Sequence, residues 1–251
     1  MPNRQPLRPK TPKPYPTHRA LRLSALIALL GLLPALPSAA DDCALLHASL
    51  SERHAQSRQD MRTRSGEAFV QKMVDLEDAV FAAMARCPDD ARLLTLMAEL
   101  QLDLGQIPLA GLYGRKAVAA DPRGWAAHHV LGVALSMRGE HDLGIEHLRR
   151  AAKLAPDNPR VRLNLASALV RAARPGEALP LLESLTHSDC RQTAAAAYFL
   201  RGRWLLEQGR LPEARADFNQ SHNLGFSVER DILAPPGLAP PHEPGRPTPA
   251  R

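Results

Sequence analysis

The chain has 251 residues, of which 32 are Lys or Arg and 26 are Asp or Glu, so its formal net charge is +6. Six of the basic residues and none of the acidic ones fall within residues 1–22. The rest of the chain is formally neutral, which argues against nucleic acid or an anionic membrane surface as its partner. Its many Ala and Leu residues and few aromatic ones are typical of closely packed helices.

Residues 1–40 have the three parts of a secretory signal peptide. A basic segment precedes an apolar run over 23–36, and the small residues Ser38, Ala39 and Ala40 follow. We expect cleavage after Ala40 and export across the inner membrane of a bacterium into the periplasm. The alternative is an uncleaved anchor that holds the chain on the inner membrane, facing the periplasm. The apolar run is shorter than the roughly 20 residues that a spanning helix needs.

All three cysteines lie after this leader, where an oxidising compartment would permit a disulfide bond. Cys43 begins one predicted helix, at 43–58, and Cys87 ends the next, at about 66–87. If the two helices pair in antiparallel fashion, both cysteines lie at the open end of the pair. A bridge between Cys43 and Cys87 and two unlinked buried thiols remain the alternatives. Cys190 is too far along the chain to compete.

Residues 41–90 predict an opening pair of helices that departs from the pattern of the later ones. Its first helix has no small residue at the point where two helices would cross. Its second helix keeps apolar residues at helical spacing: Phe69, Met73, Leu76, Val80 and Met84. A degenerate unit is expected at the end of a repeat array, because its outer face meets water.

Residues 91–192 repeat one pattern every 34 residues, in the units 91–124, 125–158 and 159–192. Each unit predicts two helices joined by a short turn. Pro88, Pro122 and Pro156, spaced 34 residues apart, mark the ends of the opening pair and of the first two units, because the residue before proline disfavours helix. Small residues recur where the helices would cross and at the turn: Ala98, Gly132 and Ala166; Ala110, Gly144 and Ala178; Gly105, Gly139 and Ala173. Self-similarity at a fixed period indicates a repeat protein.

A further unit, 195–228, repeats the pattern after an insertion of two residues. The four units together resemble the tetratricopeptide repeat (TPR) family, whose units are helix–turn–helix segments of 34 residues. The resemblance implies an all-α, right-handed solenoid and covers nearly all of residues 57–228. Arg201 departs from the family pattern, which prefers Leu there, and no unit has Trp at its fourth position.

Residues 229–251 have a different character. From Ala234 onwards they contain seven prolines and no aromatic residue, a composition that cannot bury enough apolar surface to fold. We therefore expect an extended, disordered tail, with Ile232 and Leu233 before it as an apolar cover for the last helix. The alternative function for the tail is a Pro-rich recognition peptide.

The sequence contains no motif that indicates catalysis. A Gly-rich phosphate loop, HExxH, CxxC and a GxSxG context are all absent, so we expect neither an enzyme nor a cofactor. Four histidines are close in sequence: His128, His129, His141 and His147. Adjacent residues on a helix point about 100° apart, so His128 and His129 cannot bind one ion on the same face. Core or surface histidines are the better interpretation than a metal site.

The TPR resemblance also implies a binding face. In that family the first helices of successive units line a concave groove through a fixed set of positions. Carried onto this chain, they define what we call the predicted groove: Thr95, Glu99, Leu102, His129, Val133, Ser136, Met137, Asn164, Ser167, Val170, Arg171, Phe199, Arg203 and Leu206. These residues are mostly small and apolar, which favours an apolar helix or an extended peptide as ligand. Asn164 matches one position of the family's carboxylate clamp, but other clamp positions hold residues such as His129 and Val133.

We therefore predict a non-catalytic scaffold or assembly factor of the bacterial cell envelope. It would bind a helix or extended peptide of another envelope protein in the predicted groove. One alternative is an accessory docking subunit of an exported enzyme or secretion system. A less favoured one is a carrier of metal or haem. We expect no contact with nucleic acid, and contact with the membrane only through the leader if it is not cleaved.

Overall fold

The computed structural model describes residues 39–60 and 66–226. Nearly all of the predicted signal peptide lies outside these residues, as do the Pro-rich tail and its predicted cover, Ile232 and Leu233. Met1–Asp42 and Cys43–Arg251 are separate compact units, and the account below concerns the second. Among the described residues, no helix combines the length and the apolar character that crossing a membrane requires.

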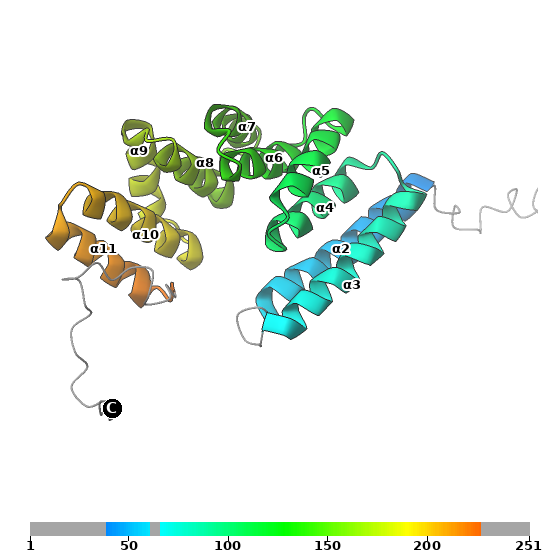
Figure 1. Ribbon diagram of the computed structural model, residues 1–251, viewed down its shortest axis with the longest axis horizontal. Coiled ribbons are helices and arrows are strands. Elements are labelled where there is room, and N and C mark those ends of the chain that lie inside the picture. Colours follow the sequence, from blue (N-terminus) through cyan, green and yellow to red (C-terminus); the bar gives the residue numbers. More distant parts are fainter. Residues whose placement is uncertain (1–38, 61–65, 227–251) are drawn as a thin grey trace, which may run out of the picture. The chain divides into compact units, whose positions relative to one another are not determined.

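Residues 39–60 and 66–226 form ten α-helices and no strands, as an all-α fold predicts. Consecutive helices pair through short turns, and each pair contacts the next, as α5 contacts α6 and α7 contacts α8 (Figure 1). The helices are α2 (Ala39–Asp60), α3 (Gly66–Arg86), α4 (Ala91–Asp103), α5 (Ile107–Ala120), α6 (Trp125–Met137), α7 (His141–Leu154), α8 (Pro159–Arg171), α9 (Pro175–Thr186), α10 (Arg191–Glu207) and α11 (Leu211–Asn223).

The local sequence sets the ends of these helices. Asp90 and Asn158 accept hydrogen bonds from the first backbone N–H groups of α4 and α8, as N-cap residues do. In the four pairs from α4 to α11, the turn within each pair has a residue with positive φ, and three of these four turns use glycine. The fourth uses Ala173, whose φ of 54° is unfavourable for a residue with a Cβ atom. The turn positions predicted from the 34-residue period are therefore confirmed.

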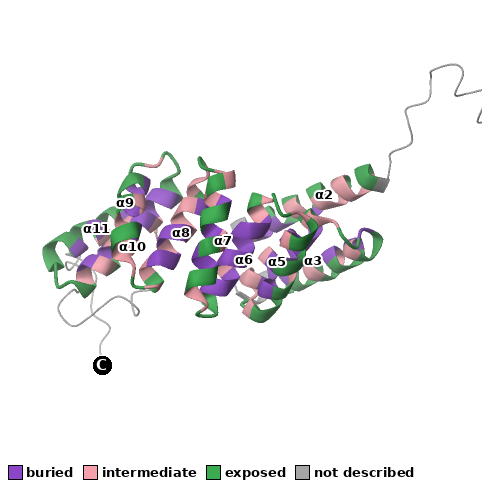
Figure 2. Cartoon of the chain, turned by 90° about the horizontal axis from the view of Figure 1, so that it is seen from above, coloured by how far each residue is buried: buried purple, intermediate pink, exposed green. Residues whose placement is uncertain are grey.

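Small residues allow the two helices of a pair to approach closely. Ala98, Gly132 and Ala166 of the first helices are buried, as the sequence predicts. Figure 2 shows buried residues along α6 and α8, among residues that are more exposed. A Cβ atom on Gly132 would lie 2.8 Å from the backbone oxygen of Gly144, and one on Gly144 would lie 2.8 Å from that of Gly132. Such contacts are shorter than real Cβ contacts, so α6 and α7 pack at a distance that excludes a side chain at either glycine.

An ion pair explains why Arg201 is compatible with the last pair of helices. Its guanidinium donates two hydrogen bonds to the carboxylate of Asp217 on α11, at 2.7 and 2.8 Å. Asp217 is only 5% exposed, and Arg201 also lies over the ring of Tyr198. A bidentate pair of this kind satisfies a buried carboxylate. Asp217 thus provides the partner that makes an arginine acceptable where the family prefers leucine.

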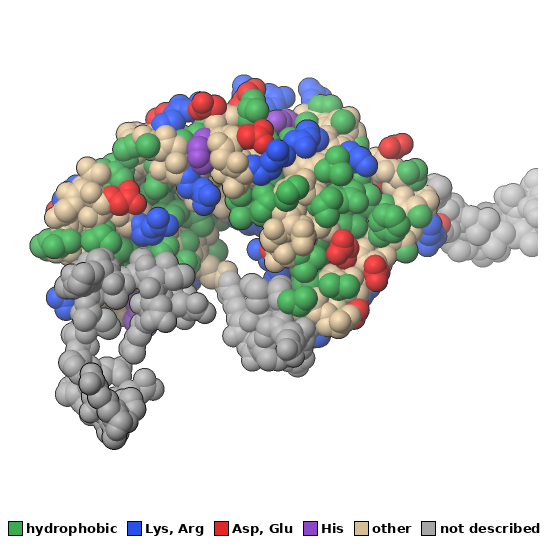
Figure 3. Space-filling model, viewed as in Figure 1, with side chains coloured by type: hydrophobic (Ala, Val, Ile, Leu, Met, Phe, Trp, Pro, Cys, Tyr) green, Lys and Arg blue, Asp and Glu red, His purple; other side chains and the backbone are tan. Residues whose placement is uncertain are grey.

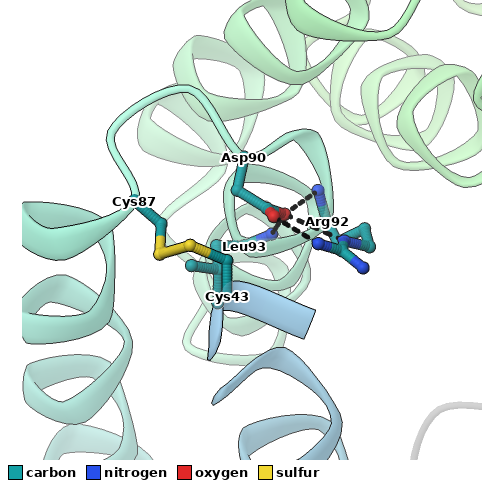
Figure 4. The surroundings of a disulfide bond; sticks show 5 residues. All are labelled: Cys43, Cys87, Asp90, Arg92 and Leu93. Carbon is teal, nitrogen blue, oxygen red and sulfur yellow. Dashed lines mark hydrogen bonds and ion pairs between the residues drawn. A yellow bond between two sulfur atoms is a disulfide. The ribbon is translucent and has the colours of Figure 1, made fainter. Parts of the chain in front are cut away.

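A disulfide bond links α2 to the end of α3. It joins Cys43 to Cys87, whose Cα atoms are 6.1 Å apart, and so selects the bridge from the two alternatives that the sequence left open. Figure 4 shows the bridge beside Leu93 and the N-cap residue Asp90 at the start of α4. Cys87 and Leu93 share a core cluster with Met73, Leu76 and Val80 of α3. The bridge therefore joins the opening pair of helices at the point where it packs against the next pair.

We predict that Gly132→Ala destabilises the protein, because the new methyl group meets backbone that cannot move aside. Overpacking of this kind lowers the free energy of unfolding by about 1–3 kcal/mol. Urea unfolding followed by circular dichroism measures the loss. Gly176→Ala is the matched control: nothing lies within 4 Å of its Cβ position in α9, so the stability should stay the same or rise slightly. Equal effects of the two substitutions would contradict the close approach of α6 and α7.

We also predict that loss of the disulfide lowers stability. The bridge closes a loop of 44 residues, which in the chain-entropy account is worth up to about 4 kcal/mol. Urea unfolding of Cys43→Ser/Cys87→Ser should show this loss, and a reducing agent should have the same effect on the unmodified protein. Cys190→Ser, which removes the exposed free thiol, is the control and should leave stability unchanged. A double variant as stable as the parent would show that the bridge contributes nothing.

Candidate binding groove

The residues of the predicted groove lie on α4, α6, α8 and α10, the first helices of the four repeat pairs. They differ widely in exposure. Three are exposed, Met137, Arg171 and Arg203, and three are buried, Thr95, His129 and Ser136. The others are partly buried: Glu99, Leu102, Val133, Asn164, Ser167, Val170, Phe199 and Leu206. A partner can reach the exposed and partly buried residues, which include most of the apolar ones.

Ser136 does not belong to that accessible surface. Its side chain is 4% exposed, and a Cβ atom on Gly144 would lie 2.2 Å from its Oγ atom. The residue therefore lies at the crossing of α6 and α7, inside its repeat. Met137, the next residue, is 47% exposed and offers its side chain to a partner.

Ion pairs connect the first helices at the N-terminal end of the predicted groove. His54 Nε2 of α2 donates to Asp103 Oδ2 of α4 at 2.8 Å, and Arg58 Nε lies 3.4 Å from the same oxygen. Arg160 Nη2 of α8 lies 3.3 Å from Glu99 Oε1 of α4. Three first helices thus share these contacts, although α6, which contacts both α4 and α8, has no charged residue. Both carboxylates are satisfied within the protein.

His129 is held neutral between these charges. It is 2% exposed, and Asn164 Nδ2 donates to its Nε2 atom at 2.7 Å. Burial, with smaller contributions from the positive charges of Arg160 and Arg58, lowers the pKa of His129 to about 3. His129 and Asn164, which the TPR resemblance placed in the groove, therefore form a polar contact between α6 and α8. They are part of the inner packing of the repeats.

Aromatic side chains define the C-terminal end of the predicted groove. The ring of Phe199 on α10 packs against Phe218 of α11, with centroids 6.0 Å apart, and stacks on Phe226 at 5.0 Å. Val170 of α8 belongs to two core clusters, one with Leu165 and Leu169 and one with Leu182 and Leu185. Val170 and Phe199 thus give this end of the predicted groove a partly buried apolar character.

Apolar residues are also exposed outside the predicted groove. Leu109 and Leu112 of α5 and Leu143 of α7 are each more than 40% exposed. Figure 3 shows hydrophobic and charged side chains interspersed on one face of the molecule. Near α2, a hollow of about 200 Å³ is lined by residues that include His47, Ser51 and Thr95. The exposed leucines of α5 and α7 therefore offer control positions, outside the predicted groove, for any test of its binding.

Of the four histidines that are close in sequence, His128 and His147 contact each other, whereas His129 contacts Asn164 of α8. His128 Nδ1 lies 2.9 Å from His147 Nδ1, and His128 Nε2 lies 3.2 Å from the carbonyl oxygen of Pro122. Burial, and then the neighbouring His128, lowers the pKa of His147, whereas Glu146 raises it. Over residues 39–60 and 66–226, no three His, Cys, Asp or Glu side chains gather as they would around a metal ion.

Several contacts of the inner face were missed from the sequence. His54, Arg58, Asp103 and Arg160 take part in the ion pairs but are not in the predicted groove. Arg160 and Asp103 occupy the second and thirteenth positions of their units, so the family pattern would have included both. His54 and Arg58 had no such signal, because the degenerate first helix gives no register for the repeat.

We predict that His129 makes stability dependent on pH. The pKa of His129 is about 6.5 in the unfolded chain and about 3 in the folded protein. The neutral side chain therefore contributes fully to stability above pH 6.5, and this contribution is lost as the pH falls towards 3. The free energy of unfolding should therefore decrease between pH 6.5 and pH 3, by at most about 1.4 kcal/mol per pH unit from this group. Urea unfolding at several pH values measures the decrease.

His129→Gln is the matched variant, because glutamine keeps an acceptor for the Asn164 amide but does not titrate. It should flatten the dependence of stability on pH over that range. His187→Gln changes an exposed histidine and should leave the dependence unchanged. If the His129 variant and the parent lose stability in parallel as the pH falls, the result would contradict a buried, neutral His129.

Comparison with known proteins supports the repeat fold. Tetratricopeptide repeat family models match residues 125–168 and 163–222. No curated protein sequence matches the chain. A TPR protein of Thermus thermophilus is 21% identical with a TM-score of 0.55, over 70% of this chain and 91% of its own.

Two further solved structures have the same fold. pilF of Pseudomonas aeruginosa is 19% identical with a TM-score of 0.54, over 74% of this chain and 82% of its own. MamA is 19% identical with a TM-score of 0.51, over 63% of this chain and 91% of its own. At these identities the likeness shows the fold alone. The family matches identify residues 125–222 as tetratricopeptide repeats, and together with the likeness to these structures they show that the chain folds as an all-α solenoid of such repeats.

Proposed function

We propose that this protein is a non-catalytic scaffold or assembly factor of the bacterial cell envelope. It binds a helix or an extended peptide of a partner protein in the predicted groove. Tetratricopeptide repeats are interaction modules, so the fold itself favours a protein or peptide partner. In this proposal no residue of the chain has a catalytic role.

The observation that carries this proposal is the apolar and accessible character of the first helices. Met137 is 47% exposed, and Val133, Val170, Phe199 and Leu206 are only partly buried. An amphipathic helix or an extended peptide binds such a surface by placing its apolar side chains against it. Accessible apolar residues on three successive first helices would accommodate several side chains of one partner.

Two features support the envelope as the location. Residues 1–40 have the pattern of a cleavable signal peptide. The Cys43–Cys87 bridge is of the kind that persists in oxidising compartments such as the periplasm. In this proposal the mature protein comprises a helical pair at 41–90, four repeats over 91–228 and a Pro-rich tail at 229–251.

Photo-crosslinking in intact cells tests the proposal. A photoreactive amino acid at Met137 samples the predicted groove, and one at Leu143 of α7 samples a similarly exposed apolar position on a second helix. We predict one dominant crosslinked product from Met137, in the envelope fraction, and none from Leu143. Equal or absent products from the two positions would contradict the predicted groove as the binding face. Products found only in the cytoplasmic fraction would contradict the envelope location.

A further inference from the structure

The four first helices of the repeats differ in charge from the four second helices. The first helices, α4, α6, α8 and α10, carry seven basic and three acidic residues. The basic ones are Arg92, Arg160, Arg162, Arg171, Arg191, Arg201 and Arg203, and the acidic ones are Glu99, Asp103 and Glu207. The second helices, α5, α7, α9 and α11, carry six of each sign. The part of the chain that follows residues 1–22 is formally neutral, yet it concentrates positive charge on the helices that form the predicted groove.

Most of these charges already have partners. Glu99 and Asp103 pair with Arg160 and Arg58, and Asp103 also accepts from His54. Arg92 bonds to the N-cap residue Asp90, Arg162 to Ser184, and Arg201 to Asp217. Arg191 donates to the backbone oxygens of Asn223 and Leu224 at the end of α11. These contacts occupy the hydrogen-bonding groups of the side chains within the protein.

Arg171 and Arg203 are the exceptions. Both are exposed, and neither has an ion-pair or hydrogen-bond partner among the described residues. Glu207 is also exposed and lies one helical turn beyond Arg203, and no ion pair joins the two in the described part of the chain. The free guanidinium groups thus outnumber the free carboxylate in this part of the predicted groove.

The two arginines stand beside the apolar end of the predicted groove. Arg171 ends α8 and follows Val170, whereas Arg203 lies one turn after Phe199 on α10, and these two helices are in contact. Successive first helices pack about 10 Å apart. On an extended peptide, two carboxylates four residues apart lie on the same face about 13 Å from each other, and the residue midway between them also lies on that face. One peptide can therefore reach both guanidinium groups and place its intervening side chains on the apolar residues.

We propose that the part of the predicted groove formed by α8 and α10 binds an acidic segment of a partner protein, in which carboxylates and apolar residues alternate along one face of an extended chain. The carboxylates accept hydrogen bonds from Arg171 and Arg203, whose planar guanidinium groups bind carboxylates in bidentate fashion. The apolar side chains contact Val170, Phe199 and Leu206. This inference rests on the proposed function and specifies the chemistry of its partner. Basic segments are excluded by repulsion from the same two arginines.

Fluorescence anisotropy with three labelled ten-residue peptides tests the inference on the purified protein. In the first probe Glu and Leu alternate at every second position, with Ser between them, so that both lie on one face of the extended peptide, and in the other two Gln or Lys replaces Glu. We expect the Glu probe to bind at least about tenfold more tightly than the Gln probe, as two charge-assisted contacts allow, and the Lys probe to show no binding. The preference of the Glu probe should decrease with added salt.

Substitutions then locate the effect. Arg171→Gln/Arg203→Gln should reduce the affinity for the Glu probe to that for the Gln probe, and Glu207→Gln should increase it. Arg150→Gln/Lys153→Gln is the matched control, because it removes the same charge from exposed positions on α7 and should change nothing. A single-stranded oligonucleotide of ten thymidines serves as a competitor with negative charge but no apolar side chains, and should not displace the Glu probe.

Each contrary result overturns the inference in a distinct way. Equal affinities for the Glu and Gln probes would show that the surface binds peptides without regard to charge. No binding of any probe would also overturn it. Equal losses in the α7 control would indicate a general effect of charge, and displacement by the oligonucleotide would indicate a nucleic-acid surface. The proposed function has its own test. A dominant crosslink from Met137 would still support the predicted groove as the binding face, even if the preference for acidic peptides is wrong.

Discussion

The close approach of the two helices within a repeat is the constraint on which the other features depend. At the α6–α7 crossing the backbones of Gly132 and Gly144 are so close that neither position accepts a Cβ atom. This contact fixes how far each helix is rotated about its axis, because the small residues must face one another. The rotation in turn decides which side chains of α6 point inward, as Ser136 does, and which stay accessible, as Met137 does. A binding surface on the first helices is thus a result of packing on their opposite side.

The fold was predictable from the sequence because repetition amplifies a weak local signal. A single glycine in a helix is ambiguous, but small residues at 98, 132 and 166, with a turn seven residues after each, fix the helix boundaries and the pairing together. The sequence does not decide whether Cys43 and Cys87 form a disulfide, because this depends on where the two side chains lie at the end of an irregular pair of helices. In the sequence Arg201 only departs from the family pattern. The structure shows the reason it is accommodated, because its guanidinium contacts Asp217, sixteen residues further along the chain.

The candidate site was less predictable for a physical reason. The family pattern states which positions face inward, but it does not state how far a long side chain reaches. Arg160 extends past a helix without charged residues to contact Glu99, and Asn164 turns towards His129 rather than towards a ligand. Contacts between residues that are 61 or 35 positions apart have no signature in a sequence without aligned relatives. The groove residues therefore divide into a set that joins the repeats and a smaller set that remains available, and only the structure separates them.

The disulfide makes the two ends of the repeat array unequal. In a stack where each unit contacts only its neighbours, terminal units open first because they have a neighbour on one side only. Cys43 and Cys87 tether the opening pair covalently, so that its helices stay joined even when their packing loosens. No such link is present in the last pair, whose two helices are held by the ion pair between Arg201 and Asp217 and by the packing of Phe199 and Phe218. We therefore expect partial unfolding to begin more readily at α11 than within the opening pair, which would give the array a direction in which it comes apart under mechanical force or during proteolysis.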